Sequence, residues 1–435
     1  MLQFSNILIN IDAYQNNRTF SPTLLPTMSP SLVAVNWYYW GADEGRGLPL
    51  GQNTQVPLEI EGEIVDVSAG SRHTFLIEYD GTVQVAGFIE SDFGYRGHLG
   101  LGPVQNCGPN GDPNKLCENT NDPMPIKKVV DASGRLVDAP RFLKAYGGVG
   151  VPADSGEMHS LLISQDGRAY VSGNNNKGQL CLGNLNEDYV DYFHEVKGIT
   201  NARRGAVGQE FTLILTSDGN VYGCGTNEVG EIGLGDNVDY APSATKIDGL
   251  RGITDLATGL GFAVYLNEND DKVFASGTNL YNQQCAFTDG NPVTKPIEVS
   301  RVIFGGMKNK VTQVYANRES SYFLYDNGVV RSCGRNDEGQ LGNGDFVNSS
   351  EEKPIVKVDL KPKVEKLGSG PSAQSVFFVA DDNNVYASGI NDRFQLGIDK
   401  IGSKDKPVKV EFEGPVEIEF VSASGTHTVA NGRYL

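Results

Sequence analysis

Residues 335–345 have the sequence RNDEGQLGNGD, in which three glycines stand among carboxylate and amide side chains. Such a stretch has three possible uses: to cradle a phosphate, to bind calcium, or to turn the chain. A calcium loop of the EF-hand type needs carboxylates at alternate positions and a late glutamate. The acids here are Asp337, Glu338 and Asp345, and no Lys-Ser or Lys-Thr pair follows as in a phosphate loop. The sequence therefore favours a turn.

The rest of the chain supplies no catalytic constellation. We find no serine nucleophile motif and no histidines at metal-ligand spacing, and the carboxylates are scattered over predicted turns. The sequence therefore predicts no catalytic residue, no cofactor and no metal site, in a protein that is not an enzyme.

Charge and hydropathy narrow the class of partner and the compartment. The 435 residues carry a net charge of −18, which opposes direct binding to nucleic acid or to an anionic membrane. No apolar stretch approaches the roughly 20 residues of a transmembrane segment, and the N-terminus lacks the features of a secretory signal. We expect a soluble intracellular protein that is not secreted. The cytoplasm, cytoskeleton or cilium is favoured, and an organelle such as the mitochondrion is the alternative.

The elements that must position these residues repeat along the chain. In most copies an Asp-Gly or Asn-Gly turn joins two short apolar runs, as in HTFLIEYDGTVQVAG, and this pattern is a strong hairpin signal. The second run of each copy ends in an anchor glycine. The anchor glycines are Gly41, Gly87, Gly173, Gly225, Gly277, Gly334 and Gly389. They are 46 to 57 residues apart, except for one interval of 86.

Seven such units predict an all-β fold, a seven-bladed β-propeller with four-stranded blades. The C-terminal VEIEFVSASGTHTVANGRYL matches the start of a unit, and AVNWYYWGADEGRGLPLG near the N-terminus supplies its end. We therefore expect one blade to be shared by the N- and C-termini, although GRYL and VNWYYW could occupy the same strand. The propeller is expected over residues 32–435, after an extended arm at residues 1–31.

The repeated motifs resemble the regulator of chromosome condensation repeat. GRNDEGQLGNGD, GTNEVGEIGLGD and GNNNKGQLCLGN resemble its first motif, and AGSRHTFLI and SGEMHSLLI its second, over roughly residues 32–432. The resemblance implies a seven-bladed propeller whose termini share a blade. Members of this family include a nucleosome-binding guanine-nucleotide exchange factor for the GTPase Ran, β-lactamase inhibitors, ultraviolet-light sensors and interaction domains, so the fold does not settle the function.

The second motif supplies the first candidate contacts with a partner. The resemblance implies that exchange would use polar residues of one propeller face. The histidine positions are His73, His159 and His427, and the other copies place Glu210, Phe262, Ser321 and a residue near Ser375 there. We retain the three histidines and Glu210 as candidates. For the histidines, however, the favoured interpretation is structural: they cap strands around a central channel.

Two breaks in the repeat supply further candidates. Residues 102–140 are rich in Pro, Asn, Asp and Gly and are predicted as an irregular insertion. A docking loop is favoured, with a disordered spacer or a wedge towards a GTPase as alternatives. The candidates within it are Cys107, Asn110, Asp112, Lys115 and Cys117. At the other break lie Trp37 and Trp40, for which packing where the termini meet is the alternative.

The cysteines are predicted to be reduced. Cys224 and Cys333 precede anchor glycines, where most copies have a small residue, and Cys181 and Cys285 stand where other copies have glycine. All four are expected as buried small residues. Cys107 and Cys117 could form a disulfide in an oxidising compartment, but free thiols are favoured because no secretory signal is present.

The favoured function is a non-catalytic protein-protein interaction propeller, a structural or docking subunit of a larger multiprotein assembly. The alternative is a guanine-nucleotide exchange factor for a small Ras-like GTPase. The expected partners are other proteins in either case, without direct contact to nucleic acid.

Overall fold

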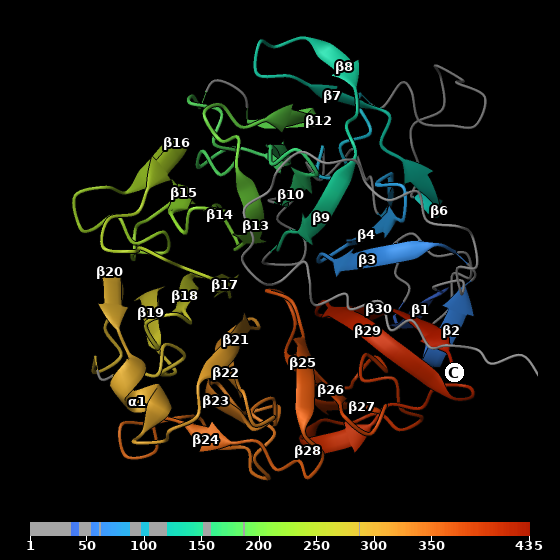
Figure 1. Ribbon diagram of the computed structural model, residues 1–435, viewed down its shortest axis with the longest axis vertical. Helices are drawn as coiled ribbons and strands as arrows, with labels where there is room; N and C mark the ends of the chain where they lie inside the picture. Colours follow the sequence, from blue (N-terminus) through green and yellow to red (C-terminus); the bar gives the residue numbers. More distant parts are fainter. Residues whose placement is uncertain are drawn as a thin grey trace, which may run out of the picture. The chain divides into compact units, whose positions relative to one another are not determined.

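The structure is a computed structural model that describes residues 36–42, 54–60, 62–87, 97–103, 120–150, 158–185, 188–286 and 288–435. The chain divides into two units, residues 1–33 and residues 34–435. The arm predicted at residues 1–31 belongs to the first unit and lies outside the described residues. The second unit is a ring of β-sheets (Figure 1).

Seven sheets form the ring, and we number them as blades in chain order, with the strands of each blade given from the inside outwards. Blade 1 contains β3 (Ile64–Ala69), β4 (His73–Glu78), β5 (Val83–Gly87) and β6 (Thr120–Pro125). Blade 2 contains β9 (Phe142–Gly147), β10 (His159–Ser164), β11 (Ala169–Asn174) and β12 (Tyr189–Glu195). Blade 3 contains β13 (Ala202–Val207), β14 (Phe211–Thr216), β15 (Val221–Thr226) and β16 (Tyr240–Lys246).

The remaining blades follow the same order. Blade 4 contains β17 (Asp255–Thr258), β18 (Phe262–Asn267), β19 (Lys272–Gly277) and β20 (Val293–Glu298), followed by the short helix α1 (Ser300–Phe304). Blade 5 contains β21 (Val311–Ala316), β22 (Ser320–Tyr325), β23 (Val330–Gly334) and β24 (Val356–Lys357). Blade 6 contains β25 (Val364–Gly368), β26 (Ser375–Ala380), β27 (Val385–Gly389) and β28 (Lys404–Lys409). Blade 7 contains β29 (Val416–Ala423), β30 (His427–Tyr434), β1 (Asn36–Gly41) and β2 (Thr54–Ile60). The predicted seven-bladed propeller is confirmed.

Position within a blade explains the apolar pattern of each strand. The second strands of blades 2 to 6 are buried at every residue, because a blade is covered by its neighbours on both faces. Fourth strands such as β16 are mostly exposed or half buried, with a single buried residue in β16, because they lie at the rim of the ring. This difference is why the sequence has nearly continuous apolar runs at the hairpins and polar stretches between them.

The turns between second and third strands require a left-handed backbone. Gly81 and Gly219 adopt φ values of +85° and +76°, which glycine reaches without steric cost. Where the glycine is missing, Asp271 and Asn383 take its place with φ values of 52° and 61°. Asp and Asn are the side chains that tolerate this region best. The turn is therefore preserved in copies that lack the Asp-Gly sequence.

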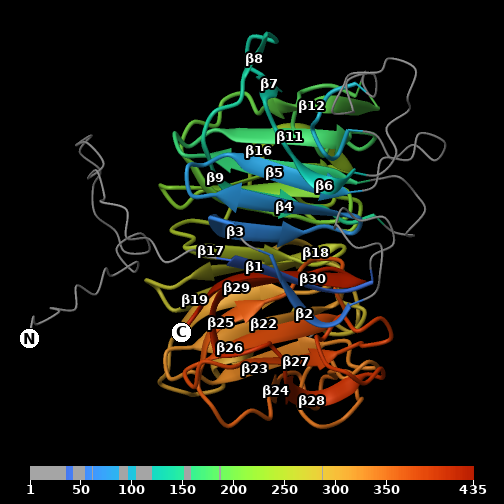
Figure 2. The ribbon, with the colours of Figure 1, turned by 90° about the vertical axis from the view of Figure 1, so that its right-hand side faces the viewer.

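The two ends of the described chain close the ring within blade 7. Strand β1 pairs antiparallel with β30, so that Trp40 lies opposite Thr428 and Gly41 opposite His427 (Figures 1 and 2). The sequences VNWYYW and GRYL thus form neighbouring strands and do not compete for one position. The shared blade is confirmed, and Gly41 occupies the anchor position of its third strand.

The innermost strands surround the axis of the ring. Strands β3, β9, β13, β17, β21, β25 and β29 are neighbours in this order, and β29 lies beside β3 again (Figure 1). Each blade therefore contributes one strand to a closed inner wall.

Part of the range 102–140, predicted as irregular, has regular structure. Residues 120–125 form β6, the fourth strand of blade 1, and residues 128–138 contain a hairpin of β7 (Lys128–Val130) and β8 (Leu136–Asp138). Strand β7 pairs parallel with β12, which extends blade 2 to six strands. Val129 is fully buried in this contact. Hydrogen bonding to blade edges orders these segments despite their turn-rich composition. Residues 104–119 lie outside the described residues.

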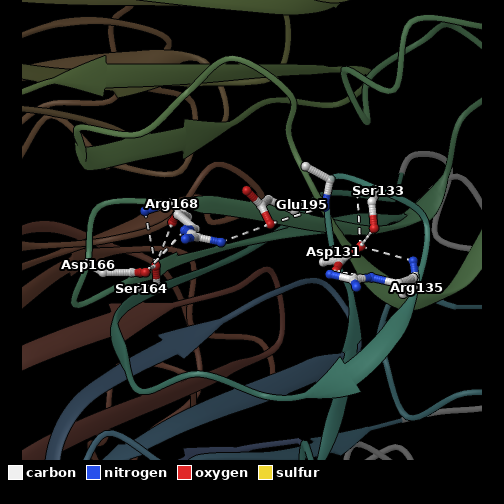
Figure 3. A network of polar contacts seen from close by, with 8 residues as sticks. Asp131, Ser133, Arg135, Ser164, Asp166, Arg168 and Glu195 are labelled. Atoms are coloured by element: carbon white, nitrogen blue, oxygen red, sulfur yellow. Dashed lines mark hydrogen bonds and ion pairs between the residues drawn. The ribbon is translucent and has the colours of Figure 1, made fainter.

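A small polar network holds the hairpin on blade 2 (Figure 3). The carboxylate of Glu195 on β12 accepts hydrogen bonds from Arg168 and from the backbone N–H of Ala132. Within the turn, Asp131 accepts hydrogen bonds from Ser133 Oγ at 2.6 Å and from Arg135 Nη2 at 2.8 Å. The hydrogen bond from Ser133 is the largest cause of the lowered pKa of Asp131. Within the described part of the chain, no helix is long and apolar enough to cross a membrane.

Candidate functional site

The stretch RNDEGQLGNGD is a loop that joins β23 to the rim of blade 5. Asn336 organises it: its amide nitrogen donates to the backbone oxygens of Asp345 and Val347, and its Oδ1 accepts the N–H of Leu341. Gln340 Oε1 accepts the N–H of Glu338, and Leu341 is fully buried. The polar side chains thus satisfy the backbone of the loop, which supports the turn interpretation over a phosphate or calcium site.

The same loop in other blades contacts the next blade through a backbone carbonyl. The carbonyl at the Gln position accepts a hydrogen bond from the hydroxyl that follows the histidine position of the next blade. The pairs are Thr212 with Gln179, Ser321 with Gln283, Thr428 with Gln395, and Ser160 with the carbonyl of His98. The loop is therefore a connection between blades, repeated around the ring.

The three predicted histidines belong to these connections. His73, His159 and His427 are each fully buried. The Nε2 atoms lie 3.1 Å from Ser160 Oγ, 2.9 Å from Thr212 Oγ1 and 3.0 Å from Thr74 Oγ1, respectively, and each hydroxyl belongs to the next blade. Their positions therefore indicate contacts between blades and do not expose the imidazoles to a partner.

The hydroxyl groups determine the tautomer of His159 and His73. The hydroxyl of Thr212 donates to the carbonyl of Gln179, so Thr212 Oγ1 must accept a hydrogen from His159 Nε2. Ser160 donates to the carbonyl of His98 and accepts from His73 in the same way. Burial lowers the pKa of His159 to about 3, and burial together with neighbouring histidines lowers the pKa of His73 well below its usual value. Both imidazoles are therefore neutral at neutral pH.

The structure corrects two of the equivalent positions in the other copies. Phe211 pairs with the anchor Gly225 as His159 pairs with Gly173, so Phe211, and not Glu210, occupies the histidine position of blade 3. Ser320, and not Ser321, occupies it in blade 5, because Ser320 pairs with Gly334. Glu210 is half buried and lies one residue before the strand. The constant interval of 14 residues to the anchor glycine in these copies could have identified both positions in the sequence.

The two predicted tryptophans lie in the interior. Trp40 is fully buried, donates its indole N–H to the carbonyl of Gln395 in blade 6 at 2.9 Å, and packs edge-on against Phe377. Trp37 is also buried, in the same strand. Packing at the junction of the termini, the alternative to partner contact, matches these positions.

Four of the cysteines form disulfides, so the prediction that they are reduced is wrong. Cys181 in blade 2 is bonded to Cys224 in blade 3, and Cys285 in blade 4 is bonded to Cys333 in blade 5. All four are buried as expected. The partners are 43 and 48 residues apart in sequence, and only the packing of consecutive blades brings them together.

The repeat explains why these cysteines meet. In each disulfide, one cysteine directly follows a buried loop residue, Leu180 or Gln284. The other cysteine directly precedes the anchor glycine of the next blade. At two interfaces without cysteine the same positions are Gly and Ser: a Cβ on Gly342 would lie 3.0 Å from Ser388 Oγ, and one on Gly233 would lie 3.4 Å from Ser276 Oγ. At these interfaces the side chain before the anchor glycine is small because a neighbouring loop packs on it.

The candidates within the insertion are Cys107, Asn110, Asp112, Lys115 and Cys117, and all of them lie outside the described residues. Among the residues that are described, no three His, Cys, Asp or Glu side chains come together as a metal-binding group.

The fold and the interfaces between blades define a repeat propeller, in which one sheet unit and one connecting loop recur around the ring. Family models described as the regulator of chromosome condensation (RCC1) repeat match residues 204–231 and 382–430. The chain therefore contains regulator of chromosome condensation repeats.

Several curated proteins are similar to this chain, two of those named here over most of its length. The human E3 ubiquitin-protein ligase HERC2 is 26% identical over 413 residues, which cover 92% of this chain but 8% of the ligase. The Ultraviolet-B receptor UVR8 of Arabidopsis thaliana is 24% identical over 89% of this chain and 79% of the receptor. A secretion-regulating guanine nucleotide exchange factor of Bos taurus is 30% identical over 43% of this chain and 41% of its own length.

Solved structures show the same fold. Human WBSCR16 superposes with a TM-score of 0.72 and 22% identity, covering 92% of this chain and all of that chain. Prp20p of Saccharomyces cerevisiae, described by its binding properties to Gsp1p and histones, superposes with a TM-score of 0.70 and 18% identity over 93% of each chain. At these identities the likeness establishes the fold alone.

Proposed function

We propose that this protein is a non-catalytic docking propeller that holds a partner protein on the loops between third and fourth strands of blades 4 to 6. The observation that carries the proposal is a set of apolar side chains on these equivalent loops that are half exposed or more. The set, called here the loop surface, consists of Leu280, Phe346, Val347 and Ile401. Exposed apolar side chains that gather in one place mark interaction sites.

The loop of blade 5 contacts both neighbouring blades. The Arg335 guanidinium of blade 5 lies 5.3 Å from the centre of the Tyr281 ring in blade 4. The N–H of Gly344 in blade 5 donates to the carbonyl of Asp405 in blade 6 at 2.8 Å. These contacts support one continuous surface across blades 4 to 6.

The charge around the loop surface favours a partner with basic groups. Glu351 and Glu352 are exposed on the blade 5 loop, whereas its Asp337 is paired with Arg335 and its Lys353 with Asp345. Complementary charge at the rim of an apolar interface steers association and selects the partner. We infer a protein partner whose apolar contact residues are flanked by Lys or Arg.

The test is the double variant Phe346→Ser with Val347→Ser. The matched control is Leu136→Ser, which removes a similarly exposed apolar side chain from β8 on blade 2. We expect wild type and control to retain a stoichiometric partner on native purification, and the double variant to bind that purified partner at least about tenfold more weakly. Equal affinity of all three proteins would refute the proposal for this surface.

The insertion is the second place where a partner could dock. Deletion of residues 104–119 spares β6 and the β7–β8 hairpin, whereas a deletion of the whole range 102–140 would remove strands of blades 1 and 2. Loss of the partner from this deletion, with the loop-surface variant unaffected, would assign docking to the insertion.

Guanine-nucleotide exchange is the second candidate function. It is supported by the similarity to the secretion-regulating guanine nucleotide exchange factor, which covers less than half of either chain. Release of a fluorescent nucleotide from a panel of small GTPases tests it. Acceleration by the wild-type protein would establish exchange and replace the docking proposal. Variants of the buried histidines are unsuitable here, because they would disturb the contacts between blades.

The disulfides bear on the compartment. Disulfides persist mainly where thiols are oxidised, and they are rare in the cytosol. We therefore propose an oxidising compartment in place of the cytoplasm. The test is thiol labelling under denaturing conditions of the protein taken from its native cells, before and after reduction, because the four cysteines are buried in the folded protein. Full labelling of Cys181 and Cys224 without reductant would favour the cytoplasm.

A further inference from the structure

Each blade places one side chain of its innermost strand at an equivalent position around the axis. In the pairing of the first and second strands, this residue lies opposite a residue of the second strand. That opposite residue comes four places after the histidine position. The set, called here the axial ring, consists of Asp66, Lys144, Arg204, Asp255, Gln313, Lys366 and Phe420.

The side chains of the axial ring converge across the axis. Lys144 of blade 2 lies with its Nζ 2.8 Å from Asp66 Oδ1 of blade 1 and 4.6 Å from the centre of the Phe420 ring of blade 7. Blade 1 stands between blades 2 and 7, so the lysine reaches past the inner strand of its neighbour. The ring positions therefore face a common space.

Besides the pair of Lys144 and Asp66, three further ring positions are satisfied by their neighbours. Arg204 Nη1 lies 2.7 Å from Asp255 Oδ1. Asp255 Oδ2 accepts the N–H of Val314 at 3.2 Å, and Gln313 Oε1 accepts the N–H of Leu367 at 3.1 Å. The acceptor atoms at blades 4 and 5 thus bind the inner strand of the following blade.

Blades 6 and 7 break this arrangement. Lys366 and Phe420 have no acceptor atom to offer to the next strand. Lys366 Nζ lies 5.2 Å from the centre of the Phe420 ring, and it forms no ion pair with a carboxylate of the described residues. Lys366 is partly buried, and a cation that is partly removed from water is disfavoured without a counter-charge. The aromatic ring compensates for only part of that cost.

The charge of the axial ring is opposite to that of the chain. Its three cations, Lys144, Arg204 and Lys366, outnumber its two carboxylates, Asp66 and Asp255, whereas the whole chain has a net charge of −18. Both carboxylates are paired with cations of the ring, so the surplus charge resides at Lys366.

We propose that Lys366 and Lys144, which converge on Phe420, form an anion site on the axis for a carboxylate or phosphate group. The anion would complete the counter-charge that the ring lacks at blades 6 and 7. A free small anion and an acidic side chain of a bound polypeptide share this chemistry. The site does not depend on the loop surface, so the two proposals succeed or fail separately.

The probes are inorganic phosphate, citrate and a hexaglutamate peptide, each compared with sodium chloride at the same ionic strength. A ligand that binds the folded state raises the midpoint of thermal unfolding, and the rise grows with its concentration. We expect a saturable rise with wild type. For Lys366→Gln we expect binding about tenfold weaker, since one charge-assisted hydrogen bond is lost. A rise with the peptide alone would identify a polypeptide source, and a rise with phosphate or citrate a free anion.

Two variants serve as controls. Lys404→Gln removes the same charge from β28, the outermost strand of the same blade, and should bind the probes as wild type does. Lys366→Arg keeps the charge and should retain the site. Should Lys366→Gln and Lys404→Gln respond alike, or the wild type respond no more than it does to chloride, the anion site would be refuted.

Discussion

At the scale of single residues, the polar side chains of the repeat are engaged by the protein itself. His159 donates to Thr212, whose hydroxyl in turn donates to the carbonyl of Gln179, and all three residues are buried. A sequence comparison alone suggests a functional face, because histidine is often a contact or catalytic residue. The structure shows that the imidazole joins two blades.

The buried histidines make folding stability depend on pH. The pKa of His159 is about 3 in the folded state and about 6.5 when unfolded, so between these values the unfolded state binds a proton that the folded state excludes. The free energy of unfolding therefore falls as pH decreases below about 6.5, by about 2 kcal/mol at pH 5 for this residue.

The measurement is urea unfolding between pH 7 and pH 5, compared with His159→Phe. Phenylalanine occupies this position in Phe211 and Phe262, and in this variant Thr212 keeps its hydrogen bond to Gln179. We expect the free energy of unfolding of His159→Phe to depend less on pH than that of the wild type. The difference should correspond to about one fewer proton taken up on unfolding. An identical pH dependence would mean that His159 does not titrate differently in the two states.

At the scale of elements, the repeat allows the same contact to be made by different chemistry. One residue of a loop meets the residue before the next anchor glycine, and this contact is a disulfide at two interfaces and Gly against Ser at two others. The hairpin of β7 and β8 is a second variation of the repeat: it adds two strands at the rim of blade 2 and leaves the order of its four inner strands unchanged.

The double variant Cys181→Gly with Cys224→Ser tests the disulfide against its own repeat. It recreates the pair found at Gly233 and Ser276, and glycine suits the left-handed backbone of Cys181, with φ of 55°. We expect a folded protein that is less stable by about 4 kcal/mol, because a cross-link spanning 43 residues restricts the unfolded chain.

The measurement is denaturant unfolding with and without reductant. Reduction should lower the stability of the wild type more than that of the double variant, which retains only the disulfide of Cys285 and Cys333. If reductant left the wild type unchanged, the cysteines would not be bonded in solution.

At the scale of the whole molecule, stability depends on closing the ring. Blade 7 combines β29 and β30 with β1, and Trp40 of β1 packs against blade 6. The contact joins residues 355 positions apart in sequence, so forming it closes a very long loop of the chain.

Trp40→Ser tests this closure. Serine is the residue at the equivalent Ser276 and Ser388, but here it would leave a cavity beside Phe377 and Phe412 and remove the hydrogen bond to Gln395. We expect a loss of about 3–5 kcal/mol in the free energy of unfolding. Ser388→Ala, at the matching position of blade 6, should cost about 1 kcal/mol or less. Equal losses of stability in the two variants would show that the contact closing the ring stabilises the protein no more than the matching contact in blade 6.

The sequence by itself determined the repeat, the hairpins, the number of blades and the sharing of one blade by the termini. These features follow from local rules: turn residues at fixed offsets, continuous apolar runs in buried strands, and anchor glycines at a regular interval. The sequence also identified the loop RNDEGQLGNGD as architectural, because its side chains satisfy their own backbone.

The tertiary structure alone decided which residues meet between blades. The disulfides join cysteines 43 and 48 residues apart, and Lys144 of blade 2 reaches Phe420 of blade 7, which is far from it in the sequence. No local pattern encodes these contacts, because each depends on how far one twisted sheet turns relative to the next. The position of Phe211 is different in kind, because its interval of 14 residues to the anchor glycine could have identified it in the sequence. The structure shows why the one-residue offset from Glu210 matters: strand register decides which side chain enters the interface, and a shift of one residue reverses the face.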